Sequence, residues 1–109
     1  MANPQYLGTL IIPLNGTASN IMTEDVFGRC RSLSLLNLDS ALTGVVTLKQ
    51  GALDGATFVT VQSPSGTDVA LAAAKSVILL AAPFNAIRLG STIAEAAIRT
   101  WEVWGNVGE

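Results

Sequence analysis

The chain consists of short apolar runs, rich in Val, Ile, Thr and aromatic residues, that turn residues interrupt about every ten positions. The interruptions are Gly, Pro, Asn, Asp and Ser, the residues that favour turns. This spacing is typical of an all-β domain, and about eight strands suit a two-sheet β-sandwich or jelly roll. The strands are expected at Tyr6–Leu14, Phe27–Leu36, Thr43–Gln50, Thr57–Gln62, Val69–Ala72, Ser76–Ala82, Ala86–Ser91 and Ala97–Trp104.

Two segments also fit a helix. Val69–Ala82 is rich in Ala and Leu, and a helix there stays open as an alternative. Thr92 and Glu95 have the spacing of a capping box, which makes a short helical turn near residues 92–98 a second candidate. No repeat or linker divides the chain. Residues 1–109 are therefore predicted to form a single β-sandwich domain, with loose termini at residues 1–5 and 106–109.

The composition points to an unusually neutral surface. Charged residues make up 13% of the chain, against about 25% in an ordinary domain, and AVILMFWYC make up 50%. The net charge is −2 and the six basic residues are scattered, so no nucleic-acid partner is expected. The longest apolar stretch is broken by Lys75 and Ser76 and is shorter than the roughly 20 residues of a membrane span. No membrane partner is expected either.

The residues that most enzymes depend on are missing. Histidine is absent, which removes the commonest general base and the commonest metal ligand. Glu24 and Asp25 are the one adjacent pair of carboxylates, and a solvated loop explains them better than catalysis does. The single Cys30 cannot close an intrachain disulfide, and a buried thiol is the simpler interpretation. We therefore predict no enzymatic activity, no metal site and no cofactor.

Two predicted strands are apolar on both sides. In the first, Leu7 and Ile11 face away from Leu10 and Ile12, and Leu79 belongs to a similar double row. A sandwich has one inner face per sheet, so the outer row of such a strand lies in water or against another subunit. Because few charged residues remain to solubilise a monomer, we predict a homo-oligomer. The alternative is that loops or a short helix cover these rows within one chain.

The two tryptophans fall on opposite sides of the last predicted strand. Val103 shares a side with Trp101, which places Trp101 in the core. Trp104 is then exposed, covered by a loop, or an anchor in an interface. Tryptophan and arginine are the residues most enriched in binding hot spots, so Arg88 is a second candidate anchor, although an ordinary solvated residue is the default. The candidate interface residues are Leu7, Ile11, Leu79, Arg88 and Trp104.

The end of the chain resembles a known family. The segments PFNAIRLGS (83–91), AEAA (94–97) and TWEVWG (100–105) are similar to the ending of small structural proteins of tailed bacteriophages. Among these, the chain most resembles the jelly-roll cement, or decoration, proteins of capsids. The resemblance covers about the last third of the chain, and the rest matches only as a strand pattern.

The resemblance implies a virion protein that is made in the host cytoplasm and binds the exterior of the capsid. Its partners would be its own copies and the major capsid protein, with a trimer at local threefold positions favoured over a dimer at twofold ones. Bridging neighbouring capsomers would hold the shell against internal DNA pressure. The alternative is a tail or fibre module that recognises a glycan on the host surface, and exposed aromatic residues on loops would favour it.

Overall fold

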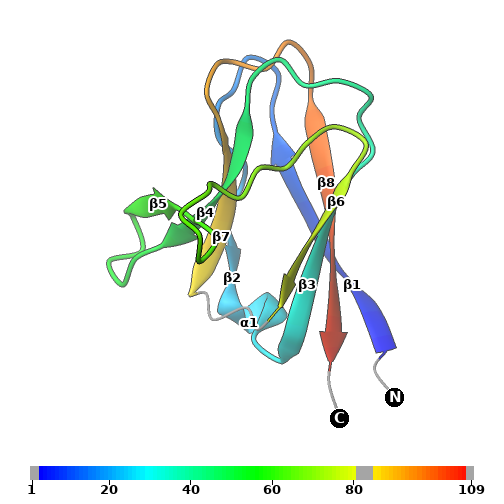
Figure 1. Ribbon diagram of the computed structural model, residues 1–109, viewed down its shortest axis with the longest axis vertical. Coiled ribbons are helices and arrows are strands. Elements are labelled where there is room, and N and C mark those ends of the chain that lie inside the picture. The colour runs from blue at the N-terminus through cyan, green and yellow to red at the C-terminus, as the bar shows by residue number, and fades with distance from the viewer. Residues whose placement is uncertain (1–2, 81–84, 108–109) are drawn as a thin grey trace.

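The computed structural model describes residues 3–80 and 85–107 and contains two antiparallel four-stranded sheets packed face to face (Figure 1). This confirms the predicted all-β, two-sheet sandwich. The elements in the described part of the chain are β1 (Asn3–Ile12), β2 (Met22–Thr23), α1 (Glu24–Phe27), β3 (Cys30–Asn37), β4 (Val46–Gly51), β5 (Phe58–Thr60), β6 (Ser76–Leu80), β7 (Ala86–Ser91) and β8 (Arg99–Val107).

The strand order is that of a jelly roll. One sheet has the order β1-β8-β3-β6 and the other has the order β2-β7-β4-β5. The first strand pairs with the last, the second with the seventh, the third with the sixth and the fourth with the fifth. A long antiparallel ribbon that folds over on itself produces these pairs, which is how an eight-stranded jelly roll is built.

The first and last strands of the chain pair with each other. β1 pairs with β8 from Asn3 opposite Val107 onward, and β8 pairs with β3 on its other side. Residues 3–5 and 106–107, which the sequence places in loose termini, belong to the paired strands β1 and β8. Residues 1–2 and 108–109 lie outside the described part. The start of β1 and the end of β8 lie at the same end of the sandwich (Figure 1).

Alternate residues of the two sheets point into one core. Trp101 and Val103 are fully buried, and Trp104 lies on the opposite side of β8, as predicted. The alternation expected in the strands around Leu48 and Leu89 is also observed. The core consists of Leu10, Ile12, Met22, Phe27, Leu33, Leu35, Val46, Leu48, Leu71, Ile87, Leu89, Trp101 and Val103.

The predicted strand at Val69–Ala72 is not a regular strand. It forms an isolated bridge between Ala70 and Thr47, and backbone hydrogen bonds on both sides of that bridge hold the segment along β4. The alternative helix is wrong for residues 69–80, because β6 occupies the second part of that segment. Residues 81–82 lie outside the described part. The two-residue β2, which pairs with β7, was not predicted because two residues carry no detectable alternation.

The short helix is α1, and the prediction of a helical turn near residues 92–98 is wrong. Glu95 is fully buried there, with 0% of its surface exposed. Its carboxylate accepts hydrogen bonds from the Thr43 N–H at 2.9 Å, the Gly44 N–H at 2.8 Å and the Ser91 hydroxyl at 2.7 Å. The Arg99 Nε completes the set with an ion pair at 2.9 Å. The Glu95 side chain therefore bonds to distant parts of the chain and does not cap a helix at Thr92.

The electrostatics of Glu95 follow from these contacts. Burial alone would raise the pKa of Glu95, but the hydrogen bonds from Thr43, Ser91 and Gly44, together with Arg99, lower it to about 2. Backbone hydrogen bonds also join Glu95 to the loop at residues 15–16. The carboxylate therefore stays ionised at neutral pH and ties together the loops at the end of the sandwich opposite the chain ends (Figure 1).

Candidate functional site

The outward side of β1, β8 and β3 forms one continuous surface, which we call the aromatic face. β8 lies in its centre, with β1 and β3 on either side. Side chains alternate along each strand, so the neighbours of the buried core residues point outward here. The aromatic face consists of Tyr6, Thr9, Ile11, Ser32, Ser34, Leu36, Thr100, Glu102 and Trp104.

An ordered aromatic pair marks this face. Tyr6 and Trp104 are directly opposite each other in the β1–β8 register. Their ring centroids are 5.4 Å apart and their planes are inclined by 59°, a tilted arrangement that aromatic pairs favour. The Trp104 Nε1–H donates to the Glu102 Oε1 at 3.1 Å. The indole is therefore held on two sides while Tyr6 remains 53% exposed.

A hollow of about 110 Å³ lies beside Trp104. Small or short side chains from β3 and β8 leave this space open next to the indole, and Pro4 of β1 contributes to its rim. An ordered ring next to an unfilled hollow is the form of a hot-spot anchor, since a partner's side chain can pack against both. The hollow is lined by Pro4, Ser32, Leu33, Ser34, Trp104, Gly105 and Asn106.

The aromatic face is almost uncharged. Glu102 is the one ionisable acid or base among its nine outward residues besides the Tyr6 phenol, and its carboxylate is already hydrogen-bonded to Trp104. The remaining residues are aliphatic or carry hydroxyl groups. Little desolvation of charge would accompany burial of this surface, and depletion of charge is typical of the central part of protein interfaces. The face is therefore suited to contact with another protein.

The predicted interface residues are only partly brought together. Ile11 lies on the aromatic face and is 39% exposed, and Trp104 lies there too. Leu7 does not, and the prediction that it shares an outer row with Ile11 is wrong. A β-bulge between Tyr6 and Gly8 shifts the register, so that Leu7 packs against the core. One extra residue in the strand is enough to reverse the side on which a side chain lies.

The other two predicted residues lie elsewhere. Arg88 belongs to the second sheet, where its Nε and Nη2 donate to the Ser19 carbonyl at 3.2 and 2.7 Å and its guanidinium lies 5.2 Å from the centre of the Phe58 ring. These contacts hold Arg88 within its own chain. Leu79 pairs with Leu33 in the backbone register, and its side chain lies outside the described part.

The two residues that hold Trp104, Tyr6 and Glu102, were not among the predicted interface residues. Glu102 could have been found, because it is two positions from Trp104 and therefore lies on the same side of the strand. Tyr6 could not, because its contact with Trp104 depends on the pairing of the first strand with the last. No local pattern in the sequence specifies which distant strands become neighbours.

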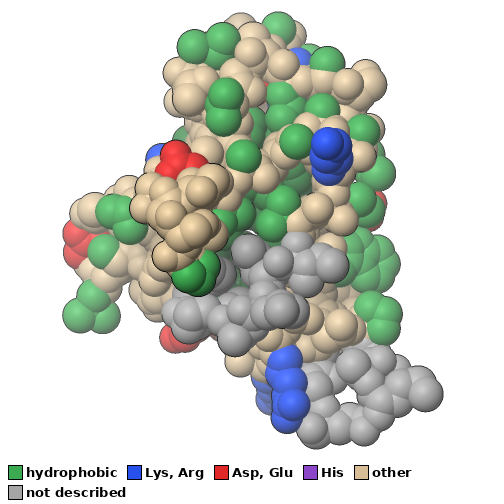
Figure 2. All heavy atoms as spheres, in the orientation of Figure 1, with side chains coloured by type: hydrophobic (Ala, Val, Ile, Leu, Met, Phe, Trp, Pro, Cys, Tyr) green, Lys and Arg blue, Asp and Glu red, His purple; other side chains and the backbone are tan. Residues whose placement is uncertain are grey.

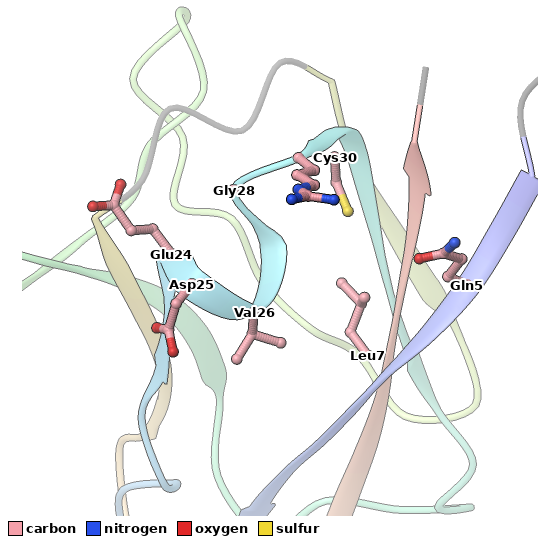
Figure 3. Close-up of a pocket in the computed structure, with 8 residues that line it drawn as sticks. Gln5, Leu7, Glu24, Asp25, Val26, Gly28 and Cys30 are labelled. Carbon is pink, nitrogen blue, oxygen red and sulfur yellow. The ribbon is translucent and has the colours of Figure 1, made fainter. Parts of the chain in front are cut away.

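A second hollow, of about 390 Å³, lies between α1 and the start of β1. Figure 3 shows Leu7 and Cys30 pointing toward this space, while the carboxylates of Glu24 and Asp25 lie on the side of α1 turned away from Cys30. Burial raises the pKa of the Cys30 thiol, which disfavours a reactive thiolate. The Asp25 carboxylate accepts a hydrogen bond from the Thr23 hydroxyl. These groups do not form a nucleophile–base pair.

The remaining observations concern other kinds of site. Among residues 3–80 and 85–107, no group of three or more Cys, Asp or Glu side chains is close enough together to hold a metal ion. No helix in the same ranges has the length and apolar character needed to cross a bilayer. Comparison with protein-family models, with curated proteins and with solved structures gives no match for this chain.

Proposed function

We propose that this chain is a non-enzymatic virion protein that binds the outside of a bacteriophage capsid as a homo-oligomer, a trimer rather than a dimer. It would stabilise the shell by bridging neighbouring copies of the major capsid protein. The main support for binding to another protein is the ordered Tyr6–Trp104 pair. The face in which this pair lies has one charged side chain among its nine residues. The capsid setting is supported by the resemblance of residues 83–105 to cement proteins and by the jelly-roll strand order.

The energetics favour association through the aromatic face. Full burial of a large apolar side chain contributes roughly 1.5–3 kcal/mol. Part of this is lost to the ordering of side chains, but Trp104 is already held by Tyr6 and Glu102, so its ordering cost is low. The partly exposed Ile11 and Leu36 extend the apolar surface on either side of β8. A contact that covers the face therefore gains more than it costs.

The charge on the aromatic face favours the capsid shell over a second copy of the same face. If two copies stacked through this face, two Glu102 carboxylates would enter one interface, and like charges in a desolvated contact are costly. A shell surface that is neutral or basic opposite Glu102 avoids this penalty. Three paired strands also present a surface broad enough for a capsid shell.

Co-sedimentation with empty shells of the major capsid protein tests the proposal. The chain should pellet with the shells in a saturable manner and raise the temperature at which the shells disassemble. The matched control is the Trp104→Glu variant, which adds a second charge to the aromatic face beside Glu102. This variant should remain in the supernatant. Failure of the folded wild-type chain to bind any shell surface would remove the capsid assignment.

A glycan-binding tail or fibre module is the second candidate, and a third hollow favours it. This hollow, of about 690 Å³, lies between the β4–β5 hairpin and α1. It places the Phe58 ring near the Thr23 hydroxyl, the Asn85 amide and the Glu24 and Asp25 carboxylates. An aromatic ring beside several hydrogen-bonding groups is a suitable surface for a sugar. Binding to a glycan array that is lost in Phe58→Ala and kept in Trp104→Ala would support this function over shell binding.

A further inference from the structure

The β4–β5 hairpin projects from the body of the sandwich, and Figure 2 shows hydrophobic side-chain atoms at its outer end. Leu53 lies in the turn of this hairpin and is 99% exposed, more than any other large apolar residue whose exposure is described. A side chain in this position gains nothing from the core of its own chain. Its exposure makes it available to another molecule.

The turn that carries Leu53 is ordered. The Asp54 carboxylate accepts hydrogen bonds from the Ala56 N–H at 2.9 Å, the Thr57 N–H at 2.8 Å and the Thr57 hydroxyl at 2.7 Å. The hydrogen bonds from Thr57 and Ala56 lower the pKa of Asp54 to about 2, so the carboxylate is ionised at neutral pH. Gly55 supplies the positive φ of 74° that closes the turn. Leu53 is therefore presented on a fixed support.

An apolar groove of about 330 Å³ lies elsewhere on the same chain, along the start of β4. It exists because the segment around Ala70 follows β4 through a single bridge and carries small side chains, which leave the neighbouring space unfilled. A cavity of about 150 Å³ already accommodates benzene, so this groove has room for a leucine side chain. It is lined by Leu42, Gly44, Val45, Val46, Ala70, Leu71, Ala72 and Ala73.

Leu53 cannot fill the groove of its own chain. The groove lies at Val46 and the hairpin turn begins after Gly51, at opposite ends of β4. At about 3.4 Å per residue, the strand separates the two features by roughly 17 Å. The projecting residue and the groove therefore lie on different parts of the surface, where a second copy can bring them together.

We propose that Leu53 of one copy inserts into the apolar groove of a second copy, and that this contact joins the subunits of the homo-oligomer. The charges beside the two features are complementary. Asp54 is the one charged residue in the hairpin turn at residues 51–57. Asp68 and Lys75 flank the groove segment, but the Asp68 carboxylate already accepts a hydrogen bond from the Gln62 amide at 2.8 Å, which leaves Lys75 as the charge that matches Asp54. Lys75 is exposed, so its ammonium group is free to approach the Asp54 of the neighbouring copy.

This inference rests on the self-association part of the proposed function. It assigns self-association and shell binding to two different surfaces. Because the projection and the groove are different patches, each copy can donate one leucine and accept another, and such a head-to-tail contact closes into a ring when the rotation permits. The aromatic face takes no part in the ring and remains open to the capsid shell. Self-association and shell binding can therefore be lost separately.

Cross-linking between differently tagged chains tests the contact directly. Cys30 is the single cysteine, so a Cys30→Ala background carries none. In that background, chains with Leu53→Cys are mixed with chains with Ala72→Cys under mild oxidation. Mixed disulfide dimers should form in preference to Leu53→Cys homodimers. The matched control is Val59→Cys, because Val59 is 57% exposed on the same hairpin but lies away from the turn. Equal cross-linking of Ala72→Cys to both positions would overturn the proposal.

Sedimentation velocity supplies a second measurement. Leu53→Ser should weaken self-association at least tenfold, whereas Val59→Ser should change it less than about threefold. Circular dichroism confirms that both variants fold. A wild-type chain that is monomeric at about 0.1 mM, or a Leu53→Ser chain that associates normally, would overturn the inference. Trp104→Ala should leave self-association unchanged, so loss of shell binding in that variant alone concerns the proposed function and leaves this contact intact.

Discussion

The two outer faces of the sandwich differ in how they cover their apolar atoms. On the β7–β4–β5 side, the Arg88 guanidinium lies over the Phe58 ring and donates to the Ser19 carbonyl. Beside it, the Lys49 Nζ donates to the Thr60 hydroxyl at 3.0 Å. Two long cationic side chains therefore lie flat over this sheet and cover it from within the chain.

The aromatic face has no such cover. None of the nine residues that define it is Lys or Arg, and Arg31 lies at the bulge of β3 beside Ser32. The ring contact of Tyr6 is with Trp104, and the indole N–H of Trp104 donates to Glu102. An excess of apolar residues in a sequence therefore does not by itself identify an interface. What distinguishes the two faces is whether the chain supplies long side chains to cover the excess. By this criterion the aromatic face is available to a partner, whereas the part of the opposite sheet that Arg88 and Lys49 cover is not.

The largest effect is expected from a substitution that lies outside both faces and should therefore change stability but not binding. Glu95→Gln removes the charge that accepts hydrogen bonds from Thr43, Gly44 and Ser91 and leaves Arg99 without its carboxylate partner. The free energy of unfolding at pH 7 should fall by about 3 kcal/mol, measured by chemical denaturation. Molecules that remain folded should bind shells normally. A loss of affinity in the folded fraction would show that the aromatic face depends on these loops.

Glu95 also determines the direction in which the stability of the fold changes with pH. The pKa of Glu95 is about 2 in the folded chain and near 4.5 when the chain is unfolded, so the unfolded state binds the proton more readily. The stabilisation is complete above about pH 4.5 and is lost as the pH falls toward 2. Wild-type stability should therefore fall more steeply than that of Glu95→Gln across this range. Parallel curves for the two proteins would contradict the assignment.

The next effect compares the faces directly. Trp104→Ala removes the indole that lies beside Tyr6 and the hollow at Ser34. Affinity for shells should fall roughly 30-fold or more, since truncation of a central tryptophan costs about 2 kcal/mol or more. The melting temperature should fall only modestly, because Trp104 is half-buried. A large fall in melting temperature with unchanged binding would instead make Trp104 a structural residue.

Arg88→Ala is the matched change on the opposite face. It leaves the Ser19 carbonyl without its cationic donor and uncovers Phe58, which should cost about 1–3 kcal/mol of stability. Shell affinity should change less than about twofold. If Arg88→Ala reduced binding as much as Trp104→Ala does, the opposite face would be an interface too, and the distinction between covered and uncovered faces would fail.

Much of the fold was predictable because it depends on local alternation. Trp101 and Val103 are buried and Trp104 points outward, as the two-residue period requires. The failures have tertiary causes. Leu7 lies on the unexpected side because a bulge inserts one residue into β1, and a bulge has no reliable sequence signal. Glu95 has a local signal for a helix, but its burial among distant loops decides its structure.

The candidate site was predictable only in part, for a related reason. Trp104 could be named from its side of one strand, whereas Tyr6 became its neighbour through pairing of the two ends of the chain. Arg88 was a candidate anchor because of its residue type. In the structure its guanidinium donates to the carbonyl of Ser19, which belongs to a distant loop of the same chain. Sequence patterns predict which side of a strand a residue lies on. They do not predict which segment of the same chain covers that side.

The smallest expected effect concerns salt, and it distinguishes the two faces by their charge. Raising the salt concentration from about 0.1 M to about 1 M shortens the Debye length from about 10 Å to about 3 Å. If shells bind the aromatic face, Glu102 is the one charged side chain in the contact, and the affinity should change less than about threefold. If shells bind the opposite face, Lys49 and Arg88 both enter the contact, and screening should weaken binding about tenfold or more. Sedimentation of shells at the two concentrations measures the difference, and Trp104→Ala measured alongside should show the same weak response to salt, because that change removes apolar contact and no charge.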